Sequence, residues 1–420
     1  MLLQTTNLYK KLQKQYSRRI NLDLSRIKKV LLKLDNPHLE IKNPINIIGS
    51  DGKMSVLTSL QSFLTTDKKY TASFTSPHLF DLRKRFFLKN KFISLKDIKK
   101  FISIIEATKE KLTLFELLTC IYILASKNKK KLSYNLIESG LFFRKDSTNL
   151  WNYPRAQIIT NINFQHQEWI RPKTINEICK QKVKYLSKKT TIYIAKQEKN
   201  TLKIIKKILQ NNPSKKIYSN NWKLIESKEK IFYKDNKVKI PINSNYIHSD
   251  GLKQNLCLAI KVALDLGVKK SSIIKTIPKI KFEGRVQYIK KGKLRGLLNK
   301  NEKLLLDGCH SEKSAINLYN YLKSVKEPIY GVIGMQKNKM PETFIKSFKN
   351  IFQKIIILKT PDEPNAIEPK YLKKILQKNN YKCETAKSIL SSLKKITNKK
   401  KKLIVVFGSL YLVGSFLRFN

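Results

Sequence analysis

The stretch PINIIGSDGKMSVLTSL, residues 44–60, constrains the fold of this chain more than any other segment. An apolar run typical of a buried strand enters a turn bounded by Gly49 and Gly52, and a helical pattern follows Lys53. A strand, a glycine turn and a helix in this order direct backbone N–H groups and a helix N-terminus at an anion. Lys53 would reach the terminal phosphates of a nucleotide, and the hydroxyl of Ser55 would hold Mg²⁺. The segment therefore predicts a phosphate-binding loop.

One residue of this turn departs from a standard phosphate loop. Met54 directly follows Lys53, where such loops carry Ser or Thr, so the hydroxyl of Ser55 comes one position late. Spacing alone therefore leaves an alternative open, which is an ordinary turn between a strand and a helix with an exposed lysine.

Strand-like apolar runs alternate with amphipathic helical stretches through most of the sequence. INIIGS precedes KMSVLTSLQSFL, and the helical FELLTCIYILASK precedes the strand-like YNLIESG. This alternation predicts an α/β fold in which helices cover both faces of a mostly parallel sheet. Ligands of such sheets bind at the C-terminal ends of the strands.

Two domains are predicted, because 420 residues exceed one ordinary core. Short strands and turns from about residue 190 to 246 interrupt the pattern, and LLLDGCHS, PIYGVIGM, KIIILKTP and KLIVVFGSL then restart it. We place a domain with the phosphate loop at residues 1–281 and a smaller, Rossmann-like α/β domain at residues 282–420.

The net charge of +56 would normally suggest binding to nucleic acid or to an anionic membrane surface. Few of the 86 basic residues are Arg, although Arg is favoured for bidentate contacts to phosphates and bases. The lysines are spread along the whole chain instead of forming one basic patch. A uniform compositional bias therefore explains the charge better than a nucleic-acid partner does, although the charge would still attract nucleotides.

The cysteines and apolar runs indicate a cytoplasmic protein. The five cysteines form no CxxC pair and no metal-ligand spacing, which favours free thiols in a reducing compartment. The N-terminal residues lack an apolar core of signal-peptide length. The most apolar run, LIVVFGSLYLVGSFL, is shorter than the ~20 residues of a membrane-spanning helix, so we expect a buried strand followed by a turn. We expect no membrane contact, and nothing in the sequence demands an oligomer.

Polar clusters follow several other predicted strands. TSPHL places Ser76 and His78 after one strand, IESGLFFRKDSTN places Glu138 after another, and NFQHQEW places His166 after a third. His310 also follows an apolar run directly. A single histidine at a strand end is most often structural, but several polar groups at one sheet edge favour a Mg²⁺–nucleotide site.

With these blocks side by side, the sequence resembles the folylpolyglutamate synthase and dihydrofolate synthase family, within the Mur ligase superfamily. GSDGKMS, TSPHL, TLFELLT and ESGLFFRKDSTN are similar to the family's GTNGKGS, TSPHL, TxFExxT and EVGLGGRLDATN. NFQHQEW, KQKVK, GRVQ, LDGCHS, GVIGMQKNK and FGSLYLVG follow in the family's order and resemble its DHQ, EKAG, GRxQ, LDGAHN, FGxxxxK and GSLYLVG blocks. Each block is weak alone, but their shared order along the chain is specific. In the family a glycine follows the lysine, so Met54 replaces a glycine and Ser55 keeps the hydroxyl.

The resemblance implies an ATP- and Mg²⁺-dependent ligase that joins L-glutamate to dihydropteroate or a reduced folate through an acyl phosphate. Residues 1–281 would form the ATP-binding, Mur-ligase-like central domain, and residues 282–420 the glutamate-ligase domain. The site would close between the two domains and exclude water from the intermediate.

The resemblance also implies site residues. Nucleotide contacts would come from Gly49, Ser50, Asp51, Gly52, Lys53, Met54, Ser55, Asn255, Arg285 and Asp307. Catalytic roles would fall to Lys53, Lys182, Arg285 and His310. Two Mg²⁺ ions would be held by Ser55, Ser76, Glu138, His166 and a carbamylated Lys182. Pterin and glutamate would contact Thr75, Pro77, His78, Phe115, Glu116, Asp146, Asn149, His310 and Ser409.

Several positions depart from the family blocks. They are Met54 for Gly, Asp51 for Asn, Phe142 and Phe143 for a Gly pair, Gln165 for Asp, Lys184 for Gly, Gly251 and Leu252 for His-Gln, and Ser311 for Asn. A diverged relative with weakened or different activity is therefore one alternative. An amino-acid ligase for a cell-wall precursor and a basic nucleic-acid-binding protein are two others. We favour retained activity, because every predicted charged catalytic group and metal ligand is present.

Overall fold

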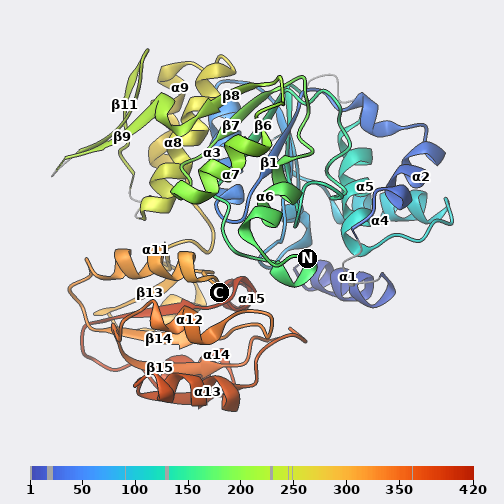
Figure 1. The fold of residues 1–420 in the computed structure, drawn as a ribbon. Coiled ribbons are helices and arrows are strands. Elements are labelled where there is room, and N and C mark those ends of the chain that lie inside the picture. Colours follow the sequence, from blue (N-terminus) through green and yellow to red (C-terminus); the bar gives the residue numbers. More distant parts are fainter. Residues whose placement is uncertain are drawn as a thin grey trace. The chain divides into compact units, whose positions relative to one another are not determined.

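The structure is a computed structural model that describes residues 2–16, 22–89, 91–127, 132–227, 230–244, 246–247, 249–361 and 363–420. The chain divides into two compact units (Figure 1). The first comprises Met1–Ser244 and Leu252–Ile280, and the second comprises Asn245–Gly251 and Lys281–Asn420.

The first unit is built on an eight-stranded sheet in the order β4-β3-β2-β5-β1-β6-β7-β8. Its strands are β1 (Pro44–Ile48), β2 (Thr71–Phe74), β3 (Phe86–Leu88), β4 (Lys91–Phe92), β5 (Tyr134–Glu138), β6 (Ala156–Ile159), β7 (Thr191–Ile194) and β8 (Lys215–Tyr218). The six strands from β2 to β8 in this order are parallel, whereas β3 and β4 pair antiparallel at one edge. Every residue of β1 is buried, as its apolar sequence requires for a central parallel strand.

Helices pack around this sheet in the first unit (Figure 1). They are α1 (Leu2–Gln15), α2 (Ser25–Lys33), α3 (Lys53–Thr66), α4 (Leu95–Glu106), α5 (Leu114–Ser126), α6 (Ile175–Val183), α7 (Lys199–Ile208), α8 (Asp250–Asp265) and α9 (Lys270–Thr276). A small antiparallel sheet joins β9 (Trp222–Glu226), β10 (Ile231–Asp235) and β11 (Lys239–Pro241).

The second unit holds a six-stranded sheet in the order β12-β13-β17-β14-β15-β16. Its strands are β12 (Gln287–Tyr288), β13 (Glu302–Leu306), β14 (Ile329–Ile333), β15 (Phe352–Leu358), β16 (Cys383–Ala386) and β17 (Lys402–Phe407), all parallel except β12. Its helices are α10 (Lys293–Gly296), α11 (Glu312–Leu322), α12 (Pro341–Lys346), α13 (Pro369–Lys378), α14 (Ile389–Lys394) and α15 (Leu410–Phe419). The predicted α/β class with mostly parallel sheets is confirmed.

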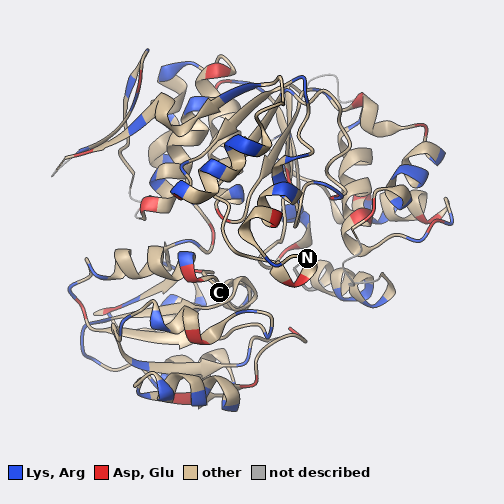
Figure 2. Ribbon diagram, in the orientation of Figure 1, with Lys and Arg blue, Asp and Glu red and all other residues tan. Residues whose placement is uncertain are grey.

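The apolar run near the C-terminus forms the buried strand β17, as predicted, and the turn after it leads into the helix α15. Phe407 at the end of β17 stacks on Phe352 of β15 with ring centres 4.7 Å apart, which ties two strands of the core together. Within the described residues, no helix combines the length and the apolar character needed to span a bilayer. Lys and Arg occur on helices and loops of both units (Figure 2).

Candidate active site

The loop between β1 and α3 has the geometry of an anion-binding turn. Gly49 and Gly52 have φ values of 150° and 88°, which residues other than glycine rarely adopt. A Cβ at Gly49 would lie 2.0 Å from Thr160 Oγ1, and one at Gly52 would lie 2.6 Å from the side-chain amide of Asn255. Gly49 is therefore required by close approach as well as by φ, and Gly52 by its φ. The contact also places Asn255 of α8 against the loop, where the family resemblance puts a nucleotide contact.

Lys53 begins helix α3 and lies over the loop. Its Nζ donates hydrogen bonds to the backbone oxygens of Gly49 and Ser50, each at 3.2 Å. Ser55 is buried in the first turn of α3, whereas the Met54 side chain is 36% exposed. Successive side chains of a helix point about 100° apart. The residue that replaces the family's glycine is therefore directed differently from Ser55.

The predicted metal ligands follow neighbouring strands. Glu138 ends β5 beside Ile47 of β1, and its Oε2 accepts a hydrogen bond from the backbone N–H of Ser76 at 2.9 Å. Glu138 is buried, at 3% exposure. His166 follows β6, and its ring centre lies 6.5 Å from that of Phe142. The structure thus brings Ser76 and Glu138 into direct contact beside the phosphate loop.

Lys182 of α6 is a buried amine that contacts the same loop. Its Nζ donates to the backbone oxygens of Gly49 at 2.9 Å and Leu141 at 2.7 Å, and lies 5.3 Å from the centre of the Phe142 ring. Burial, and then repulsion from Lys53, lowers the pKa of the Lys182 amine to about 7. A substantial fraction of the Lys182 amine is therefore unprotonated near neutral pH.

This pKa predicts how stability depends on pH. In the unfolded chain Lys182 keeps its proton up to a pKa of about 10.4. Between pH 7 and 10 the unfolded state therefore binds more protons, and the free energy of unfolding rises with pH. We expect the wild-type value minus that of Lys182→Met to rise by about 1 kcal/mol per pH unit in this window, measured by urea denaturation. Lys203→Met, an exposed control on α7, should show no such trend. If the free energies of unfolding of the wild type and of Lys182→Met changed with pH in the same way, the prediction would be wrong.

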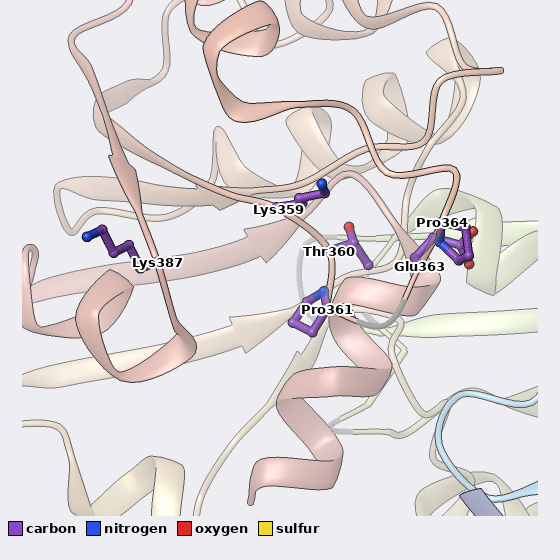
Figure 3. Close-up of a pocket in the computed structure, with 6 residues that line it drawn as sticks. All are labelled: Lys359, Thr360, Pro361, Glu363, Pro364 and Lys387. Atoms are coloured by element: carbon purple, nitrogen blue, oxygen red, sulfur yellow. The ribbon is translucent and has the colours of Figure 1, made fainter. Parts of the chain in front are cut away.

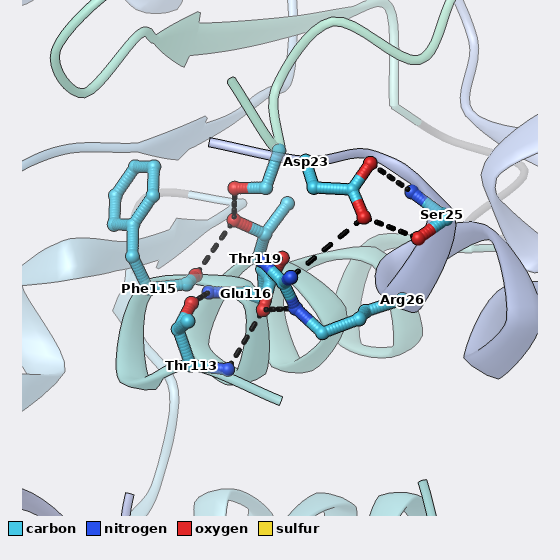
Figure 4. Close-up of polar contacts among 8 residues, drawn as sticks. Asp23, Ser25, Arg26, Thr113, Phe115, Glu116 and Thr119 are labelled. Atoms are coloured by element: carbon cyan, nitrogen blue, oxygen red, sulfur yellow. Dashed lines mark hydrogen bonds and ion pairs between the residues drawn. The ribbon is translucent and has the colours of Figure 1, made fainter. Parts of the chain in front are cut away.

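Two residues predicted to line the pterin side, Phe115 and Glu116, lie in the first turn of α5. Glu116 completes a capping box with Thr113 and forms an ion pair with Arg26 of α2 at 2.8 Å (Figure 4). The carboxylate thereby joins two helices. A Cβ at Gly140 would lie 2.8 Å from the Phe115 ring, so the loop after β5 passes close to that ring.

Asp146 and Asn149 organise that loop. The buried carboxylate of Asp146 accepts hydrogen bonds from the N–H groups of Gly140, Leu141 and Thr148, and burial raises its pKa. The N–H of Asn149 donates to the Asp146 carbonyl at 2.8 Å. Asp146 therefore fixes the backbone that carries Leu141 O to Lys182.

The TSPHL segment is held in place by Tyr9 and Arg85, two residues that the sequence motifs did not predict. His78 Nδ1 accepts a hydrogen bond from Arg85 Nε at 2.8 Å, and the Tyr9 ring packs edge-on against the imidazole at 4.4 Å. Because Arg only donates, the proton of a neutral His78 ring lies on Nε2. Thr75 donates its hydroxyl to Lys84 O, and the Ser76–Pro77 peptide is cis. No local sequence signal indicates Tyr9 or Arg85.

The second unit gathers its own predicted residues at the C-terminal ends of β13 and β17. Asp307 is buried and accepts from the N–H groups of Val286 and Cys309, each at 2.8 Å. Burial raises its pKa, and the nearby Arg285 opposes that rise. His310 Nδ1 lies 2.8 Å from Gly308 O. Ser409 caps α15, at the end of the strand next to β13.

Two departures from the family blocks have structural explanations. Phe142 and Phe143, in place of glycines, are each 1% exposed and belong to a core cluster with Ile178 and Val183. They fill the space between the sheet and α6 instead of opening a path to the loop. Ser311 is the N-cap of α11 and forms a capping box with Ser314, a role that Asn fills equally well.

A separate cavity of about 470 Å³ lies in the second unit, lined by Lys359, Thr360, Pro361, Glu363, Pro364 and Lys387 (Figure 3). It follows the C-terminal ends of β15 and β16 and contains none of the predicted site residues.

The chain is similar to known proteins along nearly its whole length. Residues 290–419 match the family model described as the dihydrofolate synthetase C-terminal domain. The dihydrofolate synthetase of Saccharomyces cerevisiae is 26% identical over 427 residues, which cover 96% of this chain and 98% of the yeast protein. A Mycobacterium tuberculosis folylpolyglutamate synthase complexed with ADP has a TM-score of 0.86 at 18% identity, covering 99% of this chain and 97% of that one. A bifunctional folylpolyglutamate/dihydrofolate synthase from Yersinia pestis, complexed with AMPPNP and a Mn ion, has a TM-score of 0.83 at 17% identity, covering 99% and 97%.

The chain has the α/β fold of solved folylpolyglutamate synthases, and a glycine-bounded loop follows the strand β1. The resemblance predicted from the motifs is confirmed, because the matching family model, the yeast relative and the solved structures named above are all described as dihydrofolate or folylpolyglutamate synthases.

Proposed function

We propose that this chain is an ATP- and Mg²⁺-dependent ligase that joins L-glutamate to dihydropteroate, to a reduced folate, or to both. The observation that carries the proposal is the loop from Gly49 to Lys53, set beside Glu138 and Ser76 at the C-terminal edge of three adjacent strands. The similarity to a dihydrofolate synthetase along nearly the whole chain supports the choice of substrates. We further propose that it works as a monomer in the cytoplasm.

The reaction follows from what amide formation requires. A carboxylate is a poor electrophile, so a carboxylate oxygen of the pterin substrate first takes the terminal phosphoryl group of ATP, and ADP leaves. The glutamate amine then attacks the acyl carbon and loses a proton, and phosphate leaves with the former carboxylate oxygen. Catalysis of this kind consists mainly of positioning and charge neutralisation around the transferring group.

The first unit supplies the phosphate-binding groups. Lys53 Nζ lies 3.2 Å from two loop carbonyl oxygens, and its ammonium would bind the terminal phosphates of a nucleotide held by this loop. The N-terminus of α3, which begins at Lys53, favours the same anion. Asn255, which touches the loop at Gly52, would bind the nucleotide beside it.

The donor set near the loop fits Mg²⁺. When bound, Mg²⁺ neutralises phosphate charge and orients the terminal phosphoryl group. Ser55, Ser76 and Glu138 would offer oxygen atoms, and His166 one nitrogen. The described part of the chain contains no cluster of three or more His, Cys, Asp or Glu side chains that could hold a metal. That composition suits an ion that takes most of its ligands from water and phosphate.

We also propose that Lys182 is carbamylated. Its lowered pKa, about 7, leaves much of the amine unprotonated, and the unprotonated amine is the form that attacks CO₂. The carbamate would add a carboxylate for a second Mg²⁺. Intact-mass measurement with and without bicarbonate tests this point.

The second unit would bind the incoming amino acid. Arg285 and Asp307 lie together, with Arg285 Nη1 3.0 Å from the Cβ position of Gly308. We propose that Arg285 neutralises transferring charge and that His310 and Ser409 contact glutamate.

The direct test is ATP-dependent phosphate release, measured with each combination of Mg²⁺, glutamate, dihydropteroate and a reduced folate monoglutamate. We expect release only when Mg²⁺, glutamate and a pterin are all present, and chelation by EDTA should abolish it reversibly. The preferred pterin separates dihydrofolate synthesis from polyglutamate extension. Release that ignores pterins, together with steeply salt-dependent binding to DNA or RNA, would favour the nucleic-acid alternative instead.

A further inference from the structure

Two of the departures from the family blocks, Asp51 and Gln165, are partners in the structure. Asp51 Oδ2 accepts a hydrogen bond from Asn163 Nδ2 at 2.6 Å and another from Gln165 Nε2 at 3.2 Å. We call these three side chains the Asp51 latch. Asp51 lies in the phosphate loop, and the other two residues lie in the segment after β6 that leads to His166.

Hydrogen bonds of the backbone and of the Ser50 hydroxyl join the same two segments. The N–H groups of Ser50 and Asp51 donate to Asn161 O at 2.8 and 3.3 Å. The Ser50 hydroxyl donates to Asn163 O at 3.2 Å and accepts from the Asn163 N–H at 3.1 Å. The latch therefore lies at the end of a short ladder between the phosphate loop and the His166 segment.

The charge of Asp51 makes this contact more than a packing detail. A carboxylate beside a triphosphate repels it, and the repulsion weakens nucleotide binding. Here two amide N–H groups donate to one oxygen of that carboxylate, and Gln165 is 9% exposed. Hydrogen bonds to a charged acceptor are stronger than neutral ones, and burial of Gln165 limits competition from water.

In the family blocks, these two positions carry Asn and Asp, whereas here they carry Asp and Gln. The family has the amide in the phosphate loop and the carboxylate in the segment after β6, whereas here the carboxylate is in the loop and the amide is in that segment. An amide–carboxylate pair is therefore kept, with the donor and the acceptor on opposite segments. Compensation of this kind explains how a charge can enter a phosphate loop without loss of the loop's shape.

We propose that Asp51 is a positioning residue that fastens the phosphate loop to the His166 segment through Asn163 and Gln165. This inference rests on the proposed function for its consequence, which is that the latch sets nucleotide affinity. It predicts that removing the carboxylate weakens nucleotide binding, whereas simple repulsion predicts that removal strengthens binding.

The test uses Gln165→Glu, which places a carboxylate against Asp51, and the exchange variant Asp51→Asn/Gln165→Glu, which restores an amide–carboxylate pair. Two readouts are measured on the full-length protein: the affinity for fluorescent ADP, and hydrogen exchange of the loop peptide that contains Ser50 and Asp51. Gln165→Glu should lower ADP affinity about tenfold or more and speed exchange, because facing carboxylates repel. The exchange variant should recover both to within about threefold of wild type.

Gln210→Glu adds the same charge at an exposed position of α7's C-terminal flank and should change neither readout. Asp51→Ala should weaken ADP binding and speed exchange. Unchanged exchange in Gln165→Glu, no recovery in the exchange variant, or tighter ADP binding by Asp51→Ala would each overturn the latch. Hydrogen exchange needs no nucleotide, so it reports on the contact even where the proposed function fails. A wild-type protein that binds no ADP would contradict the proposed function and the role of the latch in affinity.

Discussion

Lys53→Met should reduce ATP-dependent phosphate release by about 100- to 1,000-fold, the usual cost of removing one donor aimed at developing charge. Lys53 Nζ lies 3.2 Å from the loop carbonyl oxygens of Gly49 and Ser50, whereas Lys182, which also donates to the Gly49 oxygen, is buried. Met keeps most of the side-chain volume and removes the charge. Initial rates at saturating glutamate and pterin, with ATP varied, measure the effect.

Lys100→Met, an exposed residue of α4, provides the matched control and should retain wild-type rates. Thermal unfolding of both variants shows whether the fold is kept. Near-normal turnover by a folded Lys53→Met protein would show that Lys53 is not needed for phosphate release and would contradict the proposed phosphate loop.

Phe142→Ala should destabilise the protein by about 3–5 kcal/mol, the usual cost of deleting a fully buried aromatic ring. The ring is 1% exposed in a cluster with Ile178 and Val183, and it faces the Lys182 ammonium. The variant therefore loses apolar burial and a neighbour of a buried cation. Urea denaturation measures the change.

Phe164→Ala is the matched control, since that ring is 50% exposed in the segment after β6, and it should cost less than about 1 kcal/mol. A similar, small loss in both variants would show that Phe142 is not part of the core.

The fold was predictable because its strongest signals are local. Apolar runs such as residues 45–48 alternate with stretches of helical periodicity. This alternation is typical of buried parallel strands that are covered by helices. The helix α15 was not predicted, because its glycine and apolar residues read as a turn after β17. Burial on several sides removes the amphipathic period that marks a surface helix.

The candidate site was predictable where its residues belong to short motifs at the ends of strands. The glycines, Lys53 and Glu138 stand at strand ends, where parallel sheets bind ligands. The Thr113–Glu116 capping box was also visible as a T-x-x-E signal, but its role was not drawn from the sequence. The partners Arg26, Arg85 and Asn163 were not predictable, since each contact depends on how distant or irregular segments fold together.

Transfer of oxygen-18 from the pterin carboxylate to phosphate is the sharpest test of the proposed acyl phosphate. Dihydropteroate, or a reduced folate, labelled with oxygen-18 in its reacting carboxylate is incubated with ATP, Mg²⁺ and glutamate, and mass spectrometry follows both products. We expect a glutamate-extended pterin and one labelled oxygen in each phosphate released, because one carboxylate oxygen leaves with the phosphate of the acyl phosphate. Unlabelled phosphate with no extended pterin, from a folded protein that hydrolyses ATP, would contradict it.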